Sequence, residues 1–232
     1  MPARLLRKLG LSEYGADEVL LATAVCAASA YALYALCPWS ALAVLPPWLL
    51  LVWFFRDPER AAAGGACDYL APADGRVTDI GEAAAPEFMG GKALRVGIFL
   101  SPLDVHVNRS PCDGTVVHVL YRAGAFLPAY DRRASERNES LELGLLTSDG
   151  LRIVVKQIAG VLARRVVCAV EQGRALARGA RYGMIKFGSR TELYVPADAG
   201  FEAAVAVGQK VRGGQTVLLR RNPRPAGPAA SQ

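Results

Sequence analysis

The hydrophobic pattern divides the chain into one unbroken apolar block and a long region of short alternating runs. From Val19 to Phe55 there is no charged residue over 37 positions, and Leu, Ala, Val and Trp dominate. A membrane-spanning helix needs about 20 apolar residues. Val19–Leu36 barely reaches that length before Cys37-Pro38 interrupts it, and Pro46-Pro47 interrupts the second half. Two short helices in a hairpin fit this block, so we expect a membrane-associating helical segment over residues 1–60.

Beyond residue 60 the apolar runs are short and are separated by Gly, Pro and Asp, which is typical of strands joined by tight turns. We expect strands at Gly75–Ile80, Leu94–Leu100, Thr115–Tyr121, Leu141–Thr147, Leu151–Ile158, Met184–Phe187, Glu192–Val195, Phe201–Val207 and Thr216–Leu219. Val161–Val170 fits a helix or a strand, and Ala129–Glu139 fits a loop. The pattern predicts a mainly β domain over 61–220, arranged as a sandwich or a barrel. Residues 221–232, rich in Pro, Ala and Arg, are expected to form a disordered tail.

Charge favours a membrane surface as the partner. The chain has 232 residues, 52% of them hydrophobic, a mean hydropathy of +0.21 and a net charge of +6. Basic residues flank the apolar block on both sides: Arg4, Arg7 and Lys8 before it, Arg56 and Arg60 after it. The positive-inside rule then places both ends in the cytoplasm. Aromatic residues form no basic-aromatic ladder, so we expect no nucleic acid partner. The alternative is a hairpin buried in the core of a soluble protein.

Cysteine and histidine usage limits the chemistry. The five cysteines are scattered and form no CxxC pair: Cys26, Cys37, Cys67, Cys112 and Cys168. This argues against a disulfide framework and against a zinc site, and it favours a reducing compartment. The two histidines, His106 and His118, are too few for a histidine-rich metal centre, so we expect no metal.

The sequence Phe187-Gly188-Ser189-Arg190 lies between two β-leaning runs and is the candidate for nucleophilic chemistry. Gly188 has no side chain, so its carbonyl can be approached closely. The Ser189 hydroxyl follows one residue later and could attack that carbonyl if a base were present. Gly-Ser is also a common turn dipeptide, so the pair alone decides nothing.

His106 is the preferred base. It lies in a strand-like piece in which Asp104, His106 and Asn108 share one face by period two. His118 lies among Val and Leu residues, and we expect it to pack or to face solvent.

A carboxylate would fix the tautomer of the histidine, but spacing does not choose among Asp74, Asp104 and Asp113. The order Asp, His, Ser also occurs in one class of serine hydrolases. A membrane-anchored serine hydrolase using Asp74, His106 and Ser189 is therefore one alternative, although no G-x-S-x-G elbow is present. A non-enzymatic, membrane-tethered β module, in which Pro-x-Asp-Gly and Gly-Ser are only turns, is another.

Six motifs in consistent order carry a family resemblance that extends from Phe54 to about Leu219. They are Phe54-Phe55-Arg56-Asp57-Pro58, Ala71-Pro72-Ala73-Asp74-Gly75, Leu100-Ser101-Pro102-Leu103-Asp104-Val105-His106-Val107-Asn108-Arg109, Gly124-Ala125-Phe126-Leu127, Glu136-Arg137-Asn138-Glu139 and Phe187-Gly188-Ser189-Arg190. Together they resemble phosphatidylserine decarboxylase of the short bacterial or archaeal type.

The resemblance implies a self-processing proenzyme whose residues 61–220 form a barrel-sandwich-like catalytic domain. Ser189 would attack the Gly188 carbonyl to form an ester, and elimination would then break the chain. A β chain would end at Gly188, and an α chain would begin with a pyruvoyl group made from residue 189. The resemblance also assigns the triad to Asp74, His106 and Ser189. Longer relatives carry a second histidine where this chain has Arg109.

The implied reaction converts phosphatidylserine to phosphatidylethanolamine through a Schiff base on the pyruvoyl group, which acts as an electron sink. His106 would supply protons, and Arg109 and Arg137 could pair with the head group. The implied partners are the lipid substrate, the bilayer and the two associated chains, with a homodimer left open. The implied location is the cytoplasmic face of the inner membrane.

Overall fold

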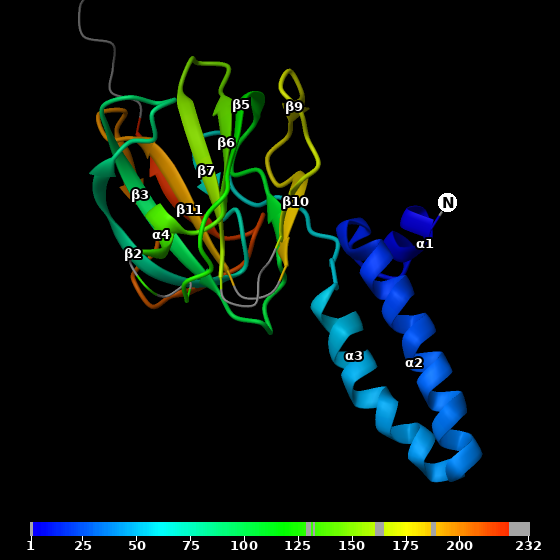
Figure 1. The fold of residues 1–232 in the computed structure, drawn as a ribbon. Coiled ribbons are helices and arrows are strands. Elements are labelled where there is room, and N and C mark those ends of the chain that lie inside the picture. The colour runs from blue at the N-terminus through cyan, green and yellow to red at the C-terminus, as the bar shows by residue number, and fades with distance from the viewer. Residues whose placement is uncertain (1, 129–130, 132, 161–164, 187–188, 223–232) are drawn as a thin grey trace, which may run out of the picture. The chain divides into compact units, whose positions relative to one another are not determined.

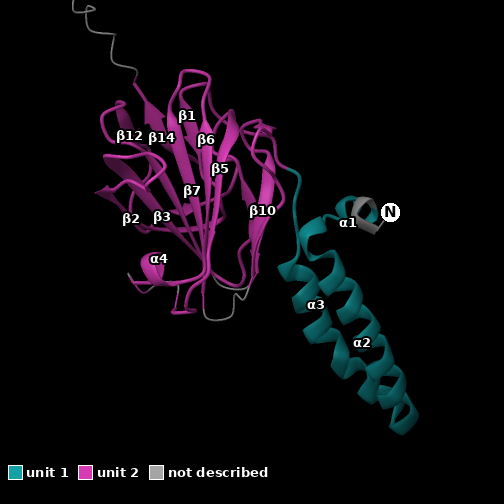
Figure 2. Ribbon diagram, turned by 45° about the horizontal axis from the view of Figure 1, so that its top comes forward, with its two compact units in different colours: residues 1–59 teal, residues 60–232 magenta. Residues whose placement is uncertain are grey.

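The computed structural model describes residues 2–128, 131, 133–160, 165–186 and 189–222 (Figure 1). The chain forms two compact units, residues 1–59 and residues 60–232, which are considered separately below (Figure 2). The first unit is helical and the second is built mainly from strands.

The first unit contains the predicted apolar hairpin. Its helices are α1 (Pro2–Lys8), η1 (Glu13–Gly15), α2 (Ala16–Leu36), η2 (Pro38–Val44) and α3 (Leu45–Phe54). Cys37 is extended, and Pro38 cannot continue the helix, so α2 ends there. Trp48 Nε1 donates to Thr23 Oγ1 at 3.1 Å and so joins α3 to α2. The hairpin prediction is confirmed, with one helix longer than expected because α2 alone has 21 residues.

The surface of this hairpin is apolar. Large exposed side chains occur along both arms: Leu20, Leu21, Val25, Tyr31, Tyr34, Leu36, Trp39, Leu42, Leu45, Leu49, Leu50 and Trp53. A folded domain in water seldom exposes so many contiguous apolar groups. The helical stretch Glu13–Leu36 is long and apolar enough to cross a membrane.

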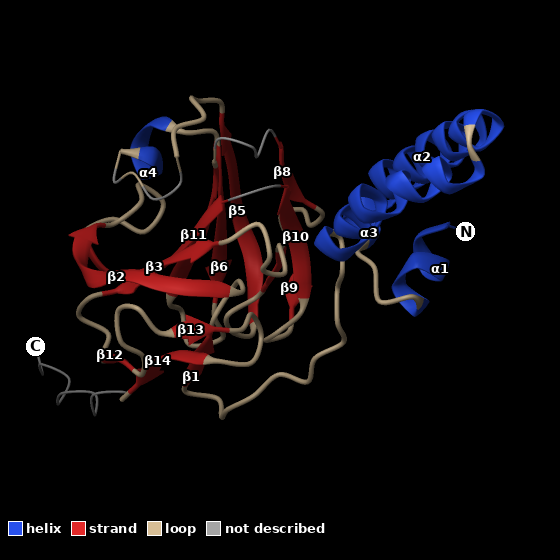
Figure 3. Ribbon diagram, turned by 90° about the horizontal axis from the view of Figure 1, so that it is seen from below, coloured by secondary structure: helices blue, strands red, loops and turns tan. Residues whose placement is uncertain are grey.

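Strands dominate the second unit (Figure 3). They are β1 (Asp68–Leu70), β2 (Gly75–Ala84), β3 (Lys92–Leu100), β4 (Val107–Arg109), β5 (Gly114–Arg122), β6 (Ser140–Leu146), β7 (Arg152–Ala159), β8 (Arg165–Cys168), β9 (Ala175–Leu176), β10 (Arg181–Lys186), β11 (Ser189–Pro196), β12 (Phe201–Ala203), β13 (Lys210–Val211) and β14 (Val217–Arg221). Each predicted strand overlaps an observed one, and the mainly β prediction is confirmed.

The strands form three sheets within the described residues. The largest has eight strands in the order β13-β2-β3-β11-β7-β6-β5-β9 and curls into a half-barrel, and two sheets of three strands, β1-β14-β12 and β4-β10-β8, complete the unit. Buried apolar side chains such as Val96, Ile98, Leu143, Ile153 and Leu193 fill the interior. β-Branched residues suit these strands because they pack well on a pleated surface.

Three segments differ from the expectations. Within Val161–Val170 the ambiguity resolves as strand β8, which pairs with β10, while residues 161–164 lie outside the described part. A short helix, α4 (Ala134–Arg137), interrupts the predicted loop at Ala129–Glu139. Arg221, expected to open the tail, pairs with Phe201 as the last residue of β14. Residues 223–232 lie outside the described part.

Candidate active site

Ser189 is the first residue of β11, and it is fully buried. It pairs with Leu100 at the end of β3 and with Ala159 at the end of β7. Its Oγ atom has no hydrogen-bond partner among the residues that the structure describes. Gly188, predicted as the acyl side of the cleavage site, and Phe187 lie outside the described residues. A buried hydroxyl without a partner is costly and asks for a functional reason.

The strand ends at Ser189, Leu100 and Ala159 are called the corner below. His106 reaches this corner on the segment that follows β3. The 101–106 segment leaves β3 directly after Leu100, the partner of Ser189. It returns at His106, whose carbonyl accepts a hydrogen bond from Ile185 N at 3.1 Å, four residues before Ser189. Both ends of the segment are therefore fixed beside the junction between β10 and β11. His106 is 0% exposed, so its ring is held inside the protein.

The tautomer of His106 follows from one hydrogen bond. Its Nδ1 atom lies 2.9 Å from the carbonyl oxygen of Asp104, which can only accept. Nδ1 therefore carries the hydrogen, and Nε2 is the basic nitrogen of the neutral ring. The carboxylate of Asp104 does not share the strand face expected from period two, because it accepts from Ser101 N at 2.9 Å in a turn. The strand begins only at Val107.

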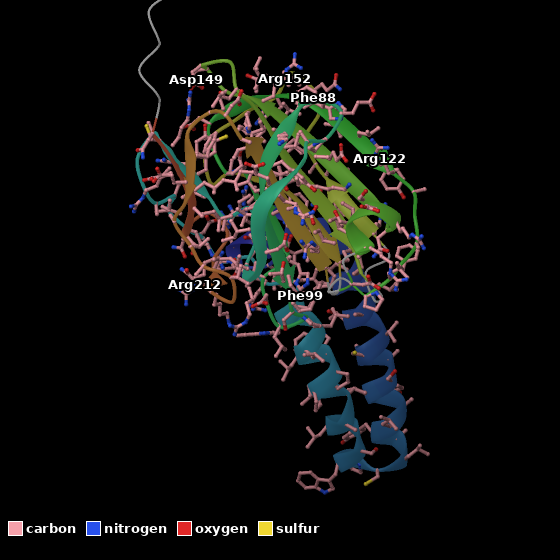
Figure 4. The ribbon with its side chains drawn as sticks, turned by 90° about the vertical axis from the view of Figure 1, so that its left-hand side faces the viewer. Phe88, Phe99, Arg122, Asp149, Arg152 and Arg212 are labelled. Carbon is pink, nitrogen blue, oxygen red and sulfur yellow. The ribbon has the colours of Figure 1, made fainter. Side chains whose placement is uncertain are left out.

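His118 and Asp113 lie away from this corner. The His118 ring stacks on Phe88, with ring centres 4.8 Å apart, so of the two settings expected for it, packing or solvent, the structure shows packing. Phe88 lies at the opposite end of the β unit from Phe99, the neighbour of Leu100 (Figure 4). Asp113 Oδ1 accepts from Arg178 N at 2.9 Å.

Asp74 reaches the corner from the turn before β2. Pro72 O accepts from Arg109 N at 2.9 Å, which ties this turn to β4. The next residue, Gly75, has φ +152°, and a Cβ there would lie 2.2 Å from the carbonyl oxygen of Phe99. Only glycine allows so close an approach, and it brings Asp74 beside the end of β3.

The Asp74 carboxylate is held by partners that the sequence did not suggest. Arg60 Nη2 donates to Oδ2 at 2.8 Å, Arg60 Nη1 to Oδ1 at 2.5 Å, and Gly213 N to Oδ1 at 2.8 Å. The side chains of Arg60 and Asp74 are only 9% and 12% exposed. This is a bidentate, nearly buried ion pair with fixed geometry.

A buried polar network lies one step inward from Ser189 and His106. Gln157 Nε2 donates to Asn108 Oδ1 at 2.7 Å, and Asn108 Nδ2 donates to Thr191 Oγ1 at 3.3 Å. Thr191 follows Ser189 by two residues and shares its strand face, and Asn108 follows His106 by two. The network joins β4, β7 and β11 beneath the corner and was not predicted.

Asn138 fixes the opposite side of the corner. Its Nδ2 atom donates to Leu127 O at 2.8 Å and to Ala159 O at 2.7 Å, and its Oδ1 accepts from Leu127 N at 2.9 Å. Ala159 is the β7 partner of Ser189. This one amide therefore joins the Gly124–Leu127 and Glu136–Glu139 motifs to Ala159, the strand neighbour of Ser189.

Comparison with known proteins identifies the family. The family described as "Phosphatidylserine decarboxylase" matches residues 49–219, which include the whole of this corner. The chain belongs to the phosphatidylserine decarboxylase family.

Relatives named phosphatidylserine decarboxylase proenzyme match over most of their length. The Symbiobacterium thermophilum protein is 48% identical over 172 residues, covering 74% of this chain and 79% of that one. The Chlorobium luteolum protein is 45% identical over 168 residues, covering 72% and 77%. The Salinibacter ruber protein is 47% identical over 172 residues, covering 73% and 75%. The resemblance seen in the motifs is confirmed.

Two arginines were predicted to bind the head group in this phosphatidylserine decarboxylase family member. Arg109 is only 3% exposed, and its Nη1 atom donates to Gly179 O at 3.2 Å. Arg137 is exposed on α4, the helix that precedes Asn138. The two therefore differ in surroundings: one is held inside the β unit and the other faces solvent.

Proposed function

We propose that this chain is a self-processing, pyruvoyl-dependent enzyme that converts phosphatidylserine to phosphatidylethanolamine. The observation that carries the proposal is the buried Ser189 hydroxyl, without a described hydrogen-bond partner, at the junction between β10 and β11. Family membership supports decarboxylation of this lipid, because the relatives bear that name. The fixed corner supports the self-processing chemistry.

Chain scission begins with Ser189. Its Oγ attacks the carbonyl carbon of Gly188 while His106 Nε2 accepts the hydroxyl proton. The C–N bond breaks, the nitrogen takes up a proton, and Gly188 becomes an ester on Ser189. Removal of the α-proton of residue 189 then expels the Gly188 carboxylate. The remaining enamine tautomerises to an imine, and water replaces its nitrogen, which leaves as ammonia.

The structure supports separate roles for the two partner residues. The Asp104 carbonyl holds the His106 tautomer that a base requires, so this backbone contact performs the orienting task usually given to a carboxylate. Asp74, fixed by Arg60 and Gly213, is proposed to place a negative charge beside the corner. That charge would stabilise His106 once it carries the proton.

The pyruvoyl group, once formed from residue 189, supplies a ketone that condenses with the substrate amine and withdraws the electron pair left by carbon dioxide. The site fits such a group, because the buried Ser189 Oγ, which has no described partner, leaves with the Gly188 carboxylate, and the methyl group that remains in its place needs no hydrogen bond. His106 would then deliver the proton that replaces the lost carboxylate. Arg137 and Arg109 are the proposed head-group residues.

The substrate is a lipid, and the apolar hairpin supports membrane association. Basic residues at both ends of the apolar block favour the cytoplasmic face. We therefore place the enzyme at the cytoplasmic face of the cell membrane, with the two chains remaining associated after scission.

Mass spectrometry of the purified protein tests the proposal. We expect two chains, residues 1–188 and 189–232, with the second lacking a free amino terminus and reacting with a ketone reagent. Ser189→Ala should stay whole and inactive, whereas the control Ser148→Ala, in a turn at the far end of β6, should cleave normally. An intact wild-type chain that is labelled at Ser189 by an organophosphate would instead indicate the serine hydrolase.

A further inference from the structure

The residue after Ser189 sends its side chain to the opposite face of the sheet. Along β11, Ser189, Thr191 and Leu193 face the interior, and alternation places Arg190 and Glu192 on the other face. The Arg190 side chain is nevertheless only 9% exposed, and Glu192 is 0% exposed. Charges are seldom so buried unless they are paired, so this face is covered and its charges have a defined arrangement.

Arg190 uses all three of its nitrogens in strong contacts. Nε donates to Glu192 Oε1 at 2.7 Å, Nη1 to Thr78 Oγ1 at 2.8 Å and Nη2 to Asp79 Oδ2 at 2.5 Å. Thr78 is the extra residue of a bulge in β2, between the paired residues Val77 and Asp79. Bulges re-aim side chains, and this one turns both Thr78 and Asp79 toward one guanidinium.

The intervening strand leaves room for this contact. β3 runs between β2 and β11, and its Gly97 is paired with Asp79 on one side and Glu192 on the other. A Cβ at Gly97 would lie 2.2 Å from Arg190 Nη2 and 2.5 Å from Asp79 Oδ2. The guanidinium therefore crosses β3 over a position where a side chain is excluded.

The acceptors are themselves fixed. Glu192 Oε2 accepts from Ser135 Oγ at 2.8 Å and from Tyr194 Oη at 2.6 Å. Burial alone would lower the pKa of Arg190, but the carboxylates of Glu192 and Asp79 raise it above its ordinary value. Arg190, Glu192, Thr78 and Asp79 therefore form a hydrogen-bonded clamp between β11 and β2.

We propose that Arg190 is a positioning residue that holds residue 189 in place before and after chain scission. The inference rests on the proposed function, in which the bond between residues 188 and 189 breaks. Residue 189 then becomes the first residue of a new chain. Its pairs with Leu100 and Ala159 are the terminal pairs of β11 with β3 and β7. Chain ends of this kind fray. Thr78 and Asp79 belong to residues 1–188 and Arg190 belongs to residues 189–232, so the clamp joins the two chains. It restrains residue 189 through the residue that follows it.

The test compares Arg190 with Arg95, because both form an ion pair with the Asp79 carboxylate. Arg190→Met keeps an aliphatic side chain and removes the fork. The matched control is Arg95→Met, because Arg95 Nη2 also pairs with Asp79, at 3.0 Å, but it lies opposite Tyr194, far along β11 from Ser189. Gly97→Ala is the second variant, because its Cβ displaces the Arg190 guanidinium without changing any charge. Each protein is purified in full length, and cleaved fraction, melting temperature, kcat and KM on phosphatidylserine vesicles are measured.

We expect Arg190→Met and Gly97→Ala to slow self-cleavage or to lower kcat per cleaved chain by about tenfold or more, with KM within about twofold, since small misplacements at a reacting centre cost this much. Arg95→Met should keep both rates. Equal cleavage and equal kcat in Arg190→Met and Arg95→Met would show that Arg190 only stabilises the fold and would overturn the proposal. If Arg190→Met does not fold, a Gly97→Ala protein with wild-type rates overturns it. Failure of the proposed function is separate, because it appears in the wild type as an uncut chain.

Discussion

Arg60 allows the sharpest test of the corner, because it holds the Asp74 carboxylate through two hydrogen bonds in a nearly buried site. In Arg60→Met, the Asp74 carboxylate, which is 12% exposed in the wild type, would lose both bonds from Arg60 and keep the bond from Gly213 N. Removing one partner of a buried pair leaves an uncompensated charge and typically costs about 3–5 kcal/mol. Because both side chains retain slight exposure, we expect about 3 kcal/mol here, and slower self-cleavage because the carboxylate loses its fixed position.

The double variant Arg60→Met/Asp74→Asn separates stability from chemistry. It removes the stranded charge, so the free energy of unfolding should recover to within about 1 kcal/mol of the wild type. Self-cleavage should stay slow, because the charge proposed to assist His106 is absent. Arg76→Met is the matched control, since Arg76 is exposed and donates to the Gly208 carbonyl rather than to a carboxylate.

Urea unfolding and a cleavage time course on gels measure both quantities. If the double variant is no more stable than Arg60→Met, the cost does not come from a stranded Asp74 charge, and the reasoning is refuted. If the double variant cleaves at the wild-type rate, Asp74 has no part in the chemistry.

Three further changes are expected to act at defined places. Asn138→Ala leaves Ala159 O and the Leu127 backbone without their amide partner, so it should cost about 2–3 kcal/mol in urea unfolding. Gly75→Ala should cost at least about 3 kcal/mol because of its positive φ and its contact with a backbone carbonyl, whereas Gly81→Ala in the same strand, with open space around it, should change stability by under about 1 kcal/mol. Burial raises the pKa of Asp79, but hydrogen bonds from its neighbours lower it below the ordinary value. Asp79→Asn should therefore destabilise the protein at pH 7, and its difference from the wild type in urea unfolding should shrink below about pH 4, as the wild-type carboxyl takes up its proton.

The sequence pattern predicted the elements that are long enough to show a hydrophobic period. Alternating runs such as Leu94–Leu100 became β3, and the uncharged block became the hairpin. Period two failed at Asp104 because a turn precedes the three-residue strand β4, which is too short to show a period. Local pattern carries no information about such a turn once proline and serine break the run.

The contacts that build the corner could not be read from the sequence. Asp74 and Arg60 are near in the chain, but nothing in either residue shows that their side chains meet. Gln157 and Asn108 are brought together only by the pairing of strands far apart in sequence. Arg190 and Glu192 would be read as solvent-facing charges in an alternating strand, and only the covering of the outer sheet face makes them a buried clamp.

The arrangement of these contacts suits the proposed self-cleavage. A chain that breaks its own backbone must hold both new ends without the bond that joined them. Here β11 lies between β3 and β7 in the middle of the eight-stranded sheet, so its pairing partners precede the cut. The side chains that follow residue 189 also contact residues before the proposed cut: Thr191 accepts from Asn108 on the inner face, and Arg190 donates to Asp79 on the outer face. A break at this junction therefore removes one covalent bond and leaves the surrounding noncovalent contacts in place, whereas a break in an edge strand such as β9 or β13 would leave an end that is paired on one side only.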